Sequence, residues 1–398
     1  MLSFMGLPSC WRRAASLLGV AAIFSALLAA CGGGVDSGGT GTYATGPITG
    51  YGSIVVGGVH YDESAALVQD DNGTTRSAAD LKLGMVTEIQ ASAPMGTASM
   101  PTATATAVRF RSEIIGHVNA VDPASGTLTV LGQTVKVRST TVFDAALVGG
   151  LAAVHTGDVV EVYGQFDAFA KRYVATRIEP RPDTAYYKLR GLVTALDPIA
   201  HTLVIGGQTI DHAGVNPVPA LAVGQILRVL LNPVKVGSVW VATAVEIGTQ
   251  DLPDRDNAEV EGRITAFTSV ESFDVDGIPV HTDSTTRFPD GRGGLVLGAQ
   301  VKVEGSTRNG VLLADKVSLE DDEVGGSERF EVRGAIKSLD SLPQTFVVRG
   351  FTVHWSNTTR FEIGTSASSL RNDREVKVKG ALSTDGTRLE ASSIDVDL

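Results

Sequence analysis

The sequence is short of residues that could crosslink it. It has two cysteines in 398 residues, and Cys10 lies inside an N-terminal apolar segment that ends at Cys31. If that segment is removed, no pair of cysteines remains for an internal disulfide. Stability must then come from packed apolar cores.

Basic residues are also scarce, and they do not cluster. The formal net charge is −11, and removal of Arg12 and Arg13 with the first thirty residues leaves 31 basic against 44 acidic residues, or −13. Proteins that bind nucleic acid need clustered Lys and Arg to neutralise phosphates. The sequence therefore predicts no nucleic-acid partner, and its acidic surface favours solubility.

Long helical periods are missing as well. Aromatic residues make up 6% of the chain, whereas 45 glycines separate short runs in which Val, Ile and Thr alternate with polar residues. Such alternation is typical of half-buried strands that are joined by tight turns. We expect an all-β protein with several small domains.

The N-terminal segment has the organisation of an export signal. Arg12 and Arg13 precede an apolar run over residues 14–30, and Cys31 and three glycines follow it. A membrane-spanning helix is the alternative, but it needs about 20 apolar residues, more than this run offers. We expect a signal peptide over residues 1–30 and a flexible Gly, Ser and Thr tether over residues 31–45.

The last four residues of this region, Leu28-Ala29-Ala30-Cys31, resemble the lipobox of bacterial lipoproteins. The resemblance implies cleavage between Ala30 and Cys31 and lipidation of Cys31. Several acyl chains, palmitate among them, would make a durable membrane anchor. The resemblance also implies export to the cell envelope. Gly32 points to the outer membrane, on its periplasmic face or at the cell surface.

Five copies of one pattern follow the tether. Each opens on a glycine within an alternating strand, and these glycines are Gly46, Gly116, Gly191, Gly262 and Gly334. We predict repeats over residues 46–111, 113–180, 185–248, 257–320 and 328–398. Polar stretches at residues 180–184, 248–257 and 321–327 are expected to link separate units.

Each copy has the pattern of three strands, a connection with room for a short helical turn, and two more strands. The connection holds Thr-Thr-x-Phe at residues 140–143, 285–288 and 358–361, and the last strand holds Ala-x-x-[Val/Ile], as at Ala175–Ile178. In the third copy, Asn216-Pro217-Val218-Pro219 stands near the place of the missing Thr-Thr-x-Phe. This order predicts a tandem array of small five-stranded OB-like β-barrels. A β-solenoid is the alternative, but its coils would be far shorter than these repeats.

The chain resembles bacterial lipoproteins that are built from tandem repeats of a domain of unknown function, numbered 5666. The resemblance rests on the lipobox, the tether and two segments of the first copy, Ile48-Thr49-Gly50-Tyr51-Gly52-Ser53-Ile54-Val55-Val56-Gly57-Gly58 and Leu81-Lys82-Leu83-Gly84-Met85. These are structural glycines and apolar positions. The resemblance therefore implies an architecture and assigns no activity.

Candidate metal ligands are dispersed. Four histidines, His60, His212, His281 and His354, lie on or beside third strands of separate copies, so they do not converge on one ion. Acid clusters at residues 70–73 and 320–323 lack the ligand spacing of a calcium loop. We interpret the first as a hairpin turn and the second as a linker, and we expect no metal.

Catalytic and cofactor motifs are missing from the sequence. It contains no Gly-x-Ser-x-Gly elbow and no phosphate-binding loop. A pair of carboxylates for glycoside cleavage is defined by its separation in space, so the sequence leaves open whether such a pair exists. We therefore expect no catalytic residue and no cofactor.

Three aromatic residues give a weak indication of binding. OB barrels hold oligosaccharides or oligonucleotides on the face of strands two and three, where Tyr61, Phe351 and Trp355 are expected. The competing interpretation, which we prefer, is that these rings fill barrel cores.

Repetition without a shared catalytic motif favours binding over catalysis. We predict a non-enzymatic, lipid-anchored, multivalent array that binds an envelope protein or a glycan. A structural spacer at the membrane surface is the alternative, and an unrecognised hydrolase is the third interpretation.

Overall fold

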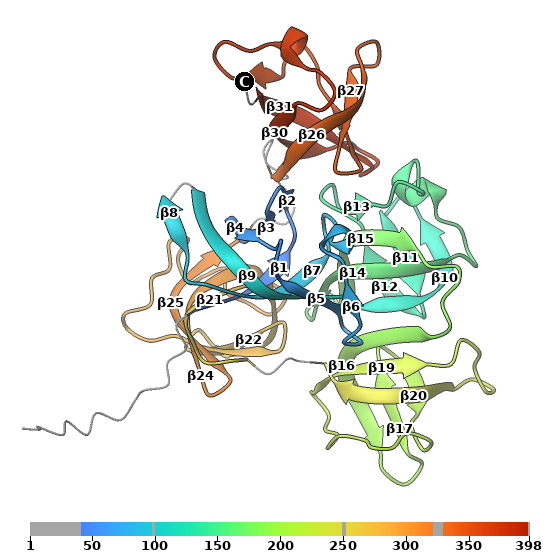
Figure 1. The fold of residues 1–398 in the computed structure, drawn as a ribbon. Coiled ribbons are helices and arrows are strands. Elements are labelled where there is room, and N and C mark those ends of the chain that lie inside the picture. The colour runs from blue at the N-terminus through green and yellow to red at the C-terminus, as the bar shows by residue number, and fades with distance from the viewer. Residues whose placement is uncertain (1–40, 98–99, 249–251, 321–328, 397–398) are drawn as a thin grey trace, which may run out of the picture. The chain divides into compact units, whose positions relative to one another are not determined.

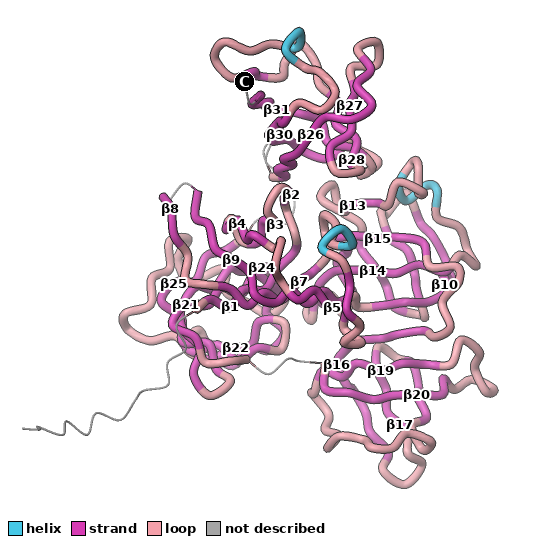
Figure 2. Tube along the Cα trace, in the orientation of Figure 1, coloured by secondary structure: helices cyan, strands magenta, loops and turns pink. Residues whose placement is uncertain are grey.

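The computed structural model describes residues 41–97, 100–248, 252–320 and 329–396, which lie in one compact unit, Gly38–Leu398. Strands form nearly all of the regular structure, as Figure 2 shows. The helical residues among those described form three short 3₁₀ turns, Ala78–Asp80, Gly150–Ala153 and Ala367–Ser369. The all-β prediction is confirmed.

The second copy shows how each barrel is built. Barrel 2 contains β10 (Ile114–Asp122), β11 (Thr127–Val130), β12 (Gln133–Lys136), β13 (Val142–Phe143), β14 (Val159–Asp167) and β15 (Arg172–Pro180). β10, β11 and β12 form an antiparallel meander, β12 pairs in parallel with β15, and β14 joins β15 back to β10. The sheet therefore closes on itself in the strand order of an OB barrel, and the predicted fold is confirmed.

The other barrels repeat this order (Figure 1). Barrel 3 contains β16 (Tyr187–Asp197), β17 (Thr202–Ile205), β18 (Gln208–Asp211), β19 (Ile226–Leu231) and β20 (Trp240–Ile247). Barrel 4 contains β21 (Arg255–Ser269), β22 (Ser272–Val275), β23 (Ile278–His281), β24 (Gln300–Arg308) and β25 (Val311–Leu319). Barrel 5 contains β26 (Phe330–Asp340), β27 (Thr345–Val348), β28 (Phe351–His354), β29 (Arg360–Phe361), β30 (Glu375–Leu382) and β31 (Arg388–Val396).

Barrel 1 has the same closure, although its first strand is broken. It contains β1 (Thr42–Pro47), β2 (Gly50–Tyr51), β3 (Ile54–Val56), β4 (Val59–Asp62), β5 (Leu67–Asp70), β6 (Thr75–Arg76), β7 (Val86–Ala91), β8 (Met95–Thr97) and β9 (Met100–Arg111). β1 and β2 together take the place of the first strand, because β1 pairs with β7 and β2 pairs with β3.

The glycine that opens each copy leaves room inside a narrow barrel. A Cβ atom at Gly116 would lie 2.3 Å from the side chain of Leu131, and one at Gly191 would lie 2.6 Å from Ile205. Any larger residue would collide with the side chains that fill the barrel from the second strand.

A short segment covers the gap beside the fifth strand in four of the barrels. This covering segment is β5 in barrel 1 and β13 in barrel 2, Arg287 with its single bridge to Lys316 in barrel 4, and β29 in barrel 5. Each pairs in parallel with the fifth strand. The second Thr of Thr-Thr-x-Phe fastens it, because its hydroxyl donates to the carbonyl of the Ala that begins Ala-x-x-[Val/Ile]: Thr141 to Ala175 at 2.7 Å, Thr286 to Ala314 at 2.7 Å and Thr359 to Ala391 at 2.8 Å. The two motifs are therefore partners.

First strands also join the barrels to one another. β1 of barrel 1 pairs in parallel with β21 of barrel 4, and β2 pairs in parallel with β26 of barrel 5. β10 of barrel 2 pairs with β16 of barrel 3 at Ile114 and Ile115. Backbone hydrogen bonds thus connect barrels that the polar linkers were expected to hold as separate units.

Candidate functional site

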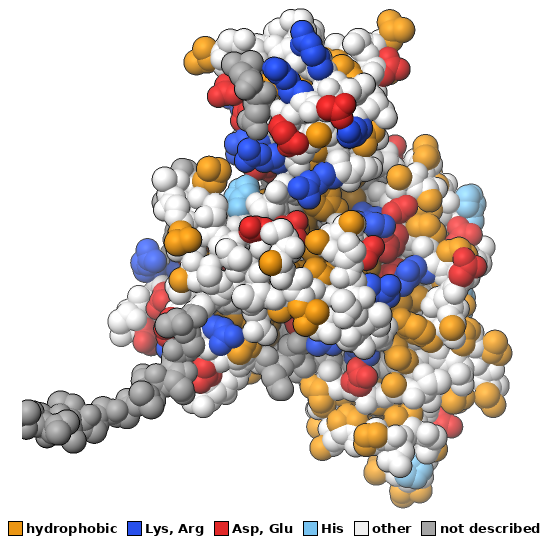
Figure 3. All heavy atoms as spheres, viewed as in Figure 1, with side chains coloured by type: hydrophobic (Ala, Val, Ile, Leu, Met, Phe, Trp, Pro, Cys, Tyr) orange, Lys and Arg blue, Asp and Glu red, His pale blue; other side chains and the backbone are white. Residues whose placement is uncertain are grey.

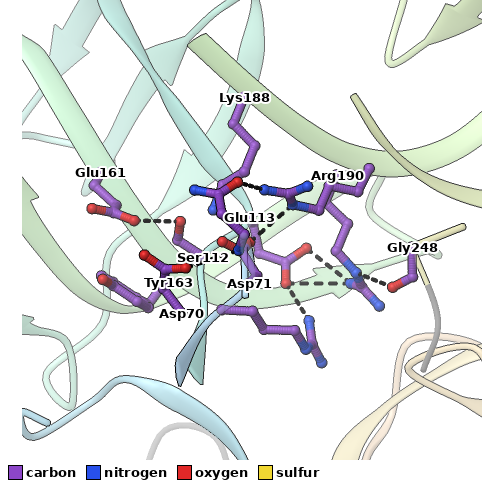
Figure 4. A network of polar contacts seen from close by, with 12 residues as sticks. Asp70, Asp71, Ser112, Glu113, Glu161, Tyr163, Lys188, Arg190 and Gly248 are labelled. Atoms are coloured by element: carbon purple, nitrogen blue, oxygen red, sulfur yellow. Dashed lines mark hydrogen bonds and ion pairs between the residues drawn. The ribbon is translucent and has the colours of Figure 1, made fainter. Parts of the chain in front are cut away.

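Buried charges gather where barrels 1 to 4 meet. The group, called here the charged joint, consists of Glu88, Arg111, Glu113, Arg190 and Asp276, all at most about one tenth exposed. Arg111 and Arg190 both contact Glu113 and Asp276, with Arg111 Nη1 2.7 Å from Glu113 Oε1 and Arg190 Nη1 3.1 Å from Asp276 Oδ1. Arg190 Nε also donates to the Gly248 carbonyl at 2.7 Å, as Figure 4 shows.

The electrostatics of the charged joint indicate a structural role. Burial alone would raise the pKa of Asp276, but Arg111 and Arg190 outweigh it and hold this pKa below its ordinary value. Burial raises the pKa of Glu88 despite the neighbouring Arg111. Each arginine is held by carboxylates on two sides, which satisfies buried charge and leaves little room for a ligand. We therefore do not place a functional site here.

A second buried cluster joins a turn of barrel 1 to barrel 3. Asp71 Oδ2 lies 2.7 Å from Lys188 Nζ and 3.2 Å from Arg228 Nε, and the contacts with Lys188 are seen in Figure 4. Burial would raise the pKa of Asp71, but Lys188 and Arg228 lower it overall. Arg228 also contacts Asn72 and Glu246. This cluster is likewise a joint between barrels.

A cavity of about 560 Å³ lies where barrels 1, 2 and 5 meet, and we call it the junction cavity. Its volume is in the range of small-molecule sites. Its wall is formed by Tyr51, Glu63, Ala78, Ala79, Leu81, Lys82, Phe143, Asp144, Ala145, Arg177, Arg349, Gly350, Phe351, Thr352 and Thr387.

Direct contacts between the three barrels frame the junction cavity. Phe143 N donates to the Gly386 carbonyl at 2.9 Å, which joins barrel 2 to the last hairpin of barrel 5. Thr176 Oγ1 donates to the Gly84 carbonyl at 2.6 Å, and Arg177 Nη1 donates to the Leu83 carbonyl at 3.3 Å. The cavity is therefore a product of the association of the barrels and belongs to no single repeat.

One side of the junction cavity carries a linked set of charges. Arg177 Nη2 lies 2.7 Å from Asp144 Oδ2, and Lys82 Nζ lies 3.5 Å from both Asp144 Oδ2 and Glu179 Oε2. Burial would raise the pKa of Asp144, but a hydrogen bond from the Ala146 N–H and the charges of Arg177 and Lys82 lower it. Asp144 is thus an ionised acceptor, and the Lys82 side chain remains 43% exposed.

The opposite side carries a loosely held arginine. Arg349 Nη1 lies 3.9 Å from Glu63 Oε1, and the Arg349 side chain is 48% exposed. Glu63 Oε2 accepts a hydrogen bond from the Ile54 N–H at 3.1 Å, so this carboxylate is fixed. Phe351 follows Arg349 closely and is half-buried in the same wall. A cation, a carboxylate and an aromatic face are therefore brought together.

The aromatic residues singled out from the sequence have different positions. Tyr61 is fully buried, and Trp355 is buried with its ring centroid 5.6 Å from that of Phe346. Both lie in barrel cores. Phe351 alone of the three lines the junction cavity.

The four histidines of the third strands also differ from one another. His60 Nδ1 lies 3.3 Å from Ser53 Oγ, and His354 Nδ1 lies 2.5 Å from Glu390 Oε2. His281 is exposed, whereas His212 is buried beside His201, with ring centroids 6.0 Å apart. Within the described residues, no group of three or more His, Cys, Asp and Glu is placed to hold a metal ion.

The first acid cluster forms the predicted hairpin turn. β5 and β6 pair around it, and Asp70 Oδ1 accepts from the N–H groups of Asn72 and Thr74 at 3.0 and 2.9 Å. Gly73 has a φ of +75°, which favours glycine. Most of the second cluster, residues 321–323, lies outside the described part of the chain.

Sequence reasoning missed the cations and carboxylates of the junction cavity. Lys82 and Arg349 occupy polar positions next to turn glycines, and such residues look like ordinary surface positions in a sequence. The one available signal was the position of Phe351 at the start of a third strand.

The signal peptide, its cleavage between Ala30 and Cys31, and the lipidation of Cys31 lie outside the described residues. None of the described residues forms a helix that is long and apolar enough to span a membrane.

Comparison with known proteins identifies three of the barrels. Residues 115–179, 261–318 and 333–395 match the model of a family described as a domain of unknown function, DUF5666. These segments fall in barrels 2, 4 and 5, the copies that contain Thr-Thr-x-Phe. No curated protein matches the chain.

Proposed function

Since three of the five barrels match the DUF5666 domain, we propose that the barrels act together as a non-enzymatic binding protein of the cell envelope. Its ligand is a short acidic glycan, held in the junction cavity. The observation that carries this proposal is the composition of the cavity wall, in which aromatic, anionic and cationic side chains from three barrels converge. The proposal thus has one site formed by several barrels, whereas the multivalent array predicted from the sequence would have a separate site on each repeat.

The apolar and anionic parts of the wall suit a sugar. Phe351 offers ring surface, and the carboxylates of Glu63 and Asp144 can accept hydrogen bonds from sugar hydroxyls. Pockets that bind small molecules combine an apolar wall with a few fixed polar groups in this way. The cavity volume of about 560 Å³ admits a short oligosaccharide.

The cationic parts of the wall favour a ligand with an acidic group. Arg349 and Lys82 are both close to half exposed, and Arg349 is 3.9 Å from its nearest carboxylate partner. An arginine with so loose a contact can turn to a carboxylate of the ligand, and such charge-assisted hydrogen bonds are among the stronger polar contacts.

The carboxylates of the cavity support binding rather than glycoside cleavage. A general acid needs a raised pKa, whereas Arg177 and Lys82 help to lower the pKa of Asp144. Glu63 is held by a backbone N–H and lies near Arg349. Both groups are thus suited to accept hydrogen bonds.

Calorimetric titration of the mature chain with matched oligosaccharides tests the proposal. We expect a uronic-acid-containing tetrasaccharide to bind more tightly than its neutral counterpart. Arg349→Ala should weaken binding by about tenfold, because it removes a charge-assisted contact. Arg292→Ala is the matched control. Arg292 belongs to barrel 4, outside the cavity wall, and its Cζ atom lies 4.5 Å from the centroid of the Phe288 ring. Equal effects of the two substitutions, or no binding of any acidic glycan, would contradict the proposal.

Membrane anchoring through Cys31 is the second part of the proposal. The lipobox-like tetrad Leu28-Ala29-Ala30-Cys31 supports it. Mass spectrometry of the protein from membrane fractions should find a chain that begins at acylated Cys31, and Cys31→Ala should release the protein from the membrane. An unmodified Cys31 would remove the anchor and leave the cavity proposal untouched.

A structural spacer is the second candidate function, and the joints between barrels favour it. β1, β2 and β10 pair with strands of other barrels, and the charged joint adds buried ion pairs. A spacer needs such stiff connections and no ligand. If none of the oligosaccharides shifts the melting temperature of the mature chain, the structural spacer becomes the preferred function.

A further inference from the structure

Barrel 3 leaves the edge of its fifth strand uncovered. Among the described residues of this barrel, none forms the parallel bridge to the fifth strand that covering segments form in the other four barrels. Residues 215–219 run past β20 instead, and Pro217 and Pro219 among them have no N–H to donate. A groove of about 470 Å³ lies between this segment and Thr243–Ile247.

The covered barrels show which backbone groups the uncovered edge presents. In barrel 4, Arg287 N donates to the Asp315 carbonyl at 2.9 Å, and Val317 N donates to the Arg287 carbonyl at 3.0 Å. Aligned on Ala-x-x-[Val/Ile], these positions correspond to Thr243 and Val245 of β20. A carbonyl and an N–H of the strand edge are thus presented to the groove, as in sheets that accept an added strand.

The covered barrels also show which side chains fit. In barrel 2 the hydroxyl of Thr141 binds the Ala175 carbonyl, and Phe143, 3% exposed, pairs with Ile178. The corresponding residues of β20 are Ala242 and Val245. A segment with Thr, and an apolar residue two positions later, therefore matches the groove.

The charge beside the groove indicates which residue can follow the apolar one. The residue after Phe143 is Asp144, and its carboxylate lies on the same side as that of Glu179, since both are 3.5 Å from Lys82 Nζ. Glu179 corresponds to Glu246, which pairs with Arg228 Nη1 at 2.5 Å and whose side chain is still 52% exposed on the groove. A basic residue directly after the apolar one is complementary to Glu246.

Barrel 3 also carries exposed apolar side chains, of which Ile247 lines the groove. Barrel 3 has more exposed large apolar side chains than any other described barrel, and they are Ile199, Val223, Val234, Val236 and Ile247. Hydrophobic side chains gather over the region of β17, β19 and β20 in Figure 3. Apolar patches of this kind often mark interaction surfaces.

We propose that the groove of barrel 3 binds an extended segment of a partner protein, which adds to β20 in parallel through the pattern Thr-x-apolar-basic. The segment takes the place that the chain's own covering segment occupies elsewhere. This site is separate from the junction cavity and does not depend on the proposed glycan.

A synthetic peptide provides the test. The probe is a fluorescent hexapeptide that copies residues 139–144 with Asp144→Lys, titrated with the mature chain by fluorescence anisotropy. We expect saturable binding, which weakens about tenfold when the lysine is changed back to aspartate, because that residue then repels Glu246. Absence of saturable binding overturns the proposal.

Two variants locate the peptide. Glu246→Lys should reverse the preference between the lysine and aspartate peptides, whereas Asp395→Lys, at the corresponding position of covered barrel 5, should not. Replacing residues 215–221 by residues 138–144 should fill the groove and abolish binding. Unchanged binding by both the graft and Glu246→Lys overturns the proposal. If the chain associates with itself and the graft abolishes this association, the groove binds a second copy of the chain. That result would also overturn the proposal.

Discussion

Barrels 2 and 3 have the same five strands in the same order, but only barrel 2 covers the edge of its fifth strand. In barrel 2, Thr141 and β13 fasten the connection to β15. In barrel 3 the corresponding connection carries Pro217 and Pro219, and a groove separates it from β20. The family model matches barrel 2 and does not match barrel 3, although it also does not match barrel 1, whose edge is covered by β5.

The comparison shows that closure of the barrel and covering of its edge depend on different residues. Closure depends on the first-strand glycine and on alternating apolar positions, which both barrels have. Covering depends on one hydroxyl and one short extended segment. A repeat can therefore lose its cover and keep its fold, and a surface for new contacts then opens at little cost in stability.

The largest expected effect comes from the charged joint, which barrels 2 and 3 share. Glu113 is 1% exposed and contacts both Arg111 and Arg190. Glu113→Gln should reduce the free energy of unfolding by about 3 kcal/mol or more, because it leaves buried charge without its partner. Thermal melting measures this effect, with exposed Glu375→Gln as the control. A small loss would show that the two barrels are held together mainly by strand pairing.

A pH series tests a different contact, in which Glu259 and Lys302 of barrel 4 lie beside Gly57 of barrel 1. Burial raises the pKa of Glu259 to about 7 despite Lys302, which lies 3.0 Å away. Between about pH 4.5 and 7 the unfolded chain loses this proton and the folded chain keeps it. Stability should therefore fall as pH rises through this window, by on the order of 3 kcal/mol.

Glu259→Gln should remove that fall, whereas exposed Glu375→Gln should keep it. Melting temperatures from pH 4 to pH 8 compare the two variants. Parallel curves for the two variants would show that Glu259 is not the titrating group.

Glycine substitutions test the feature that barrels 2 and 3 have in common. A Cβ atom would lie 2.3 Å from the nearest side-chain atom at Gly116 and 2.6 Å at Gly191. Gly116→Ala and Gly191→Ala should each cost about 1–3 kcal/mol through overpacking. Chemical denaturation measures the loss, and Gly214→Ala, with nothing within 4 Å of the added atom, is the control. A loss in only one barrel would mean that the barrels close differently.

The smallest expected effect tests the cover itself. Thr141→Val removes the buried hydrogen bond to the Ala175 carbonyl and should cost about 1 kcal/mol. Thr134→Val on the exposed face of β12 is the control. Hydrogen exchange should accelerate at β13 in Thr141→Val and stay unchanged at β20. If exchange at β13 is unaffected, the hydroxyl does not fasten the cover.

The sequence predicts the barrels well, since their signals are local. The glycines, the alternating strands and the turn at residues 70–73 each follow from near neighbours in the chain. The start of the fourth strand is another case. A glycine two residues before this strand has a left-handed conformation and donates its N–H to a carbonyl in or just after the first strand, as in Gly84 to Ile48 at 2.8 Å and Gly298 to Ile264 at 2.8 Å. A Leu-x-x-Gly sequence at residues 81–84, 221–224 and 295–298 marks this position in three copies.

The site was not predictable in the same way, because its residues come from three barrels. Lys82 and Arg349 are more than 260 residues apart, and nothing local distinguishes either from an ordinary surface cation. Contacts between distant segments, such as the pairing of β2 with β26, bring their barrels together. Phe351 was a candidate from the sequence because it lies in a third strand, and aromatic residues in that strand can be recognised from the repeat pattern.

The pairing of β1 with β21 has a consequence for folding. Thr42 lies beside Asn257, so barrel 1 can complete this contact only after more than 200 further residues have been synthesised. Contacts between residues so distant in sequence form slowly. Barrels 2 and 3, which pair with each other through neighbouring segments, can mature before the first barrel is joined to the fourth and fifth. Until then the outer edge of β1 is unpaired, and a chaperone would have most to protect at the end of the chain that is synthesised first.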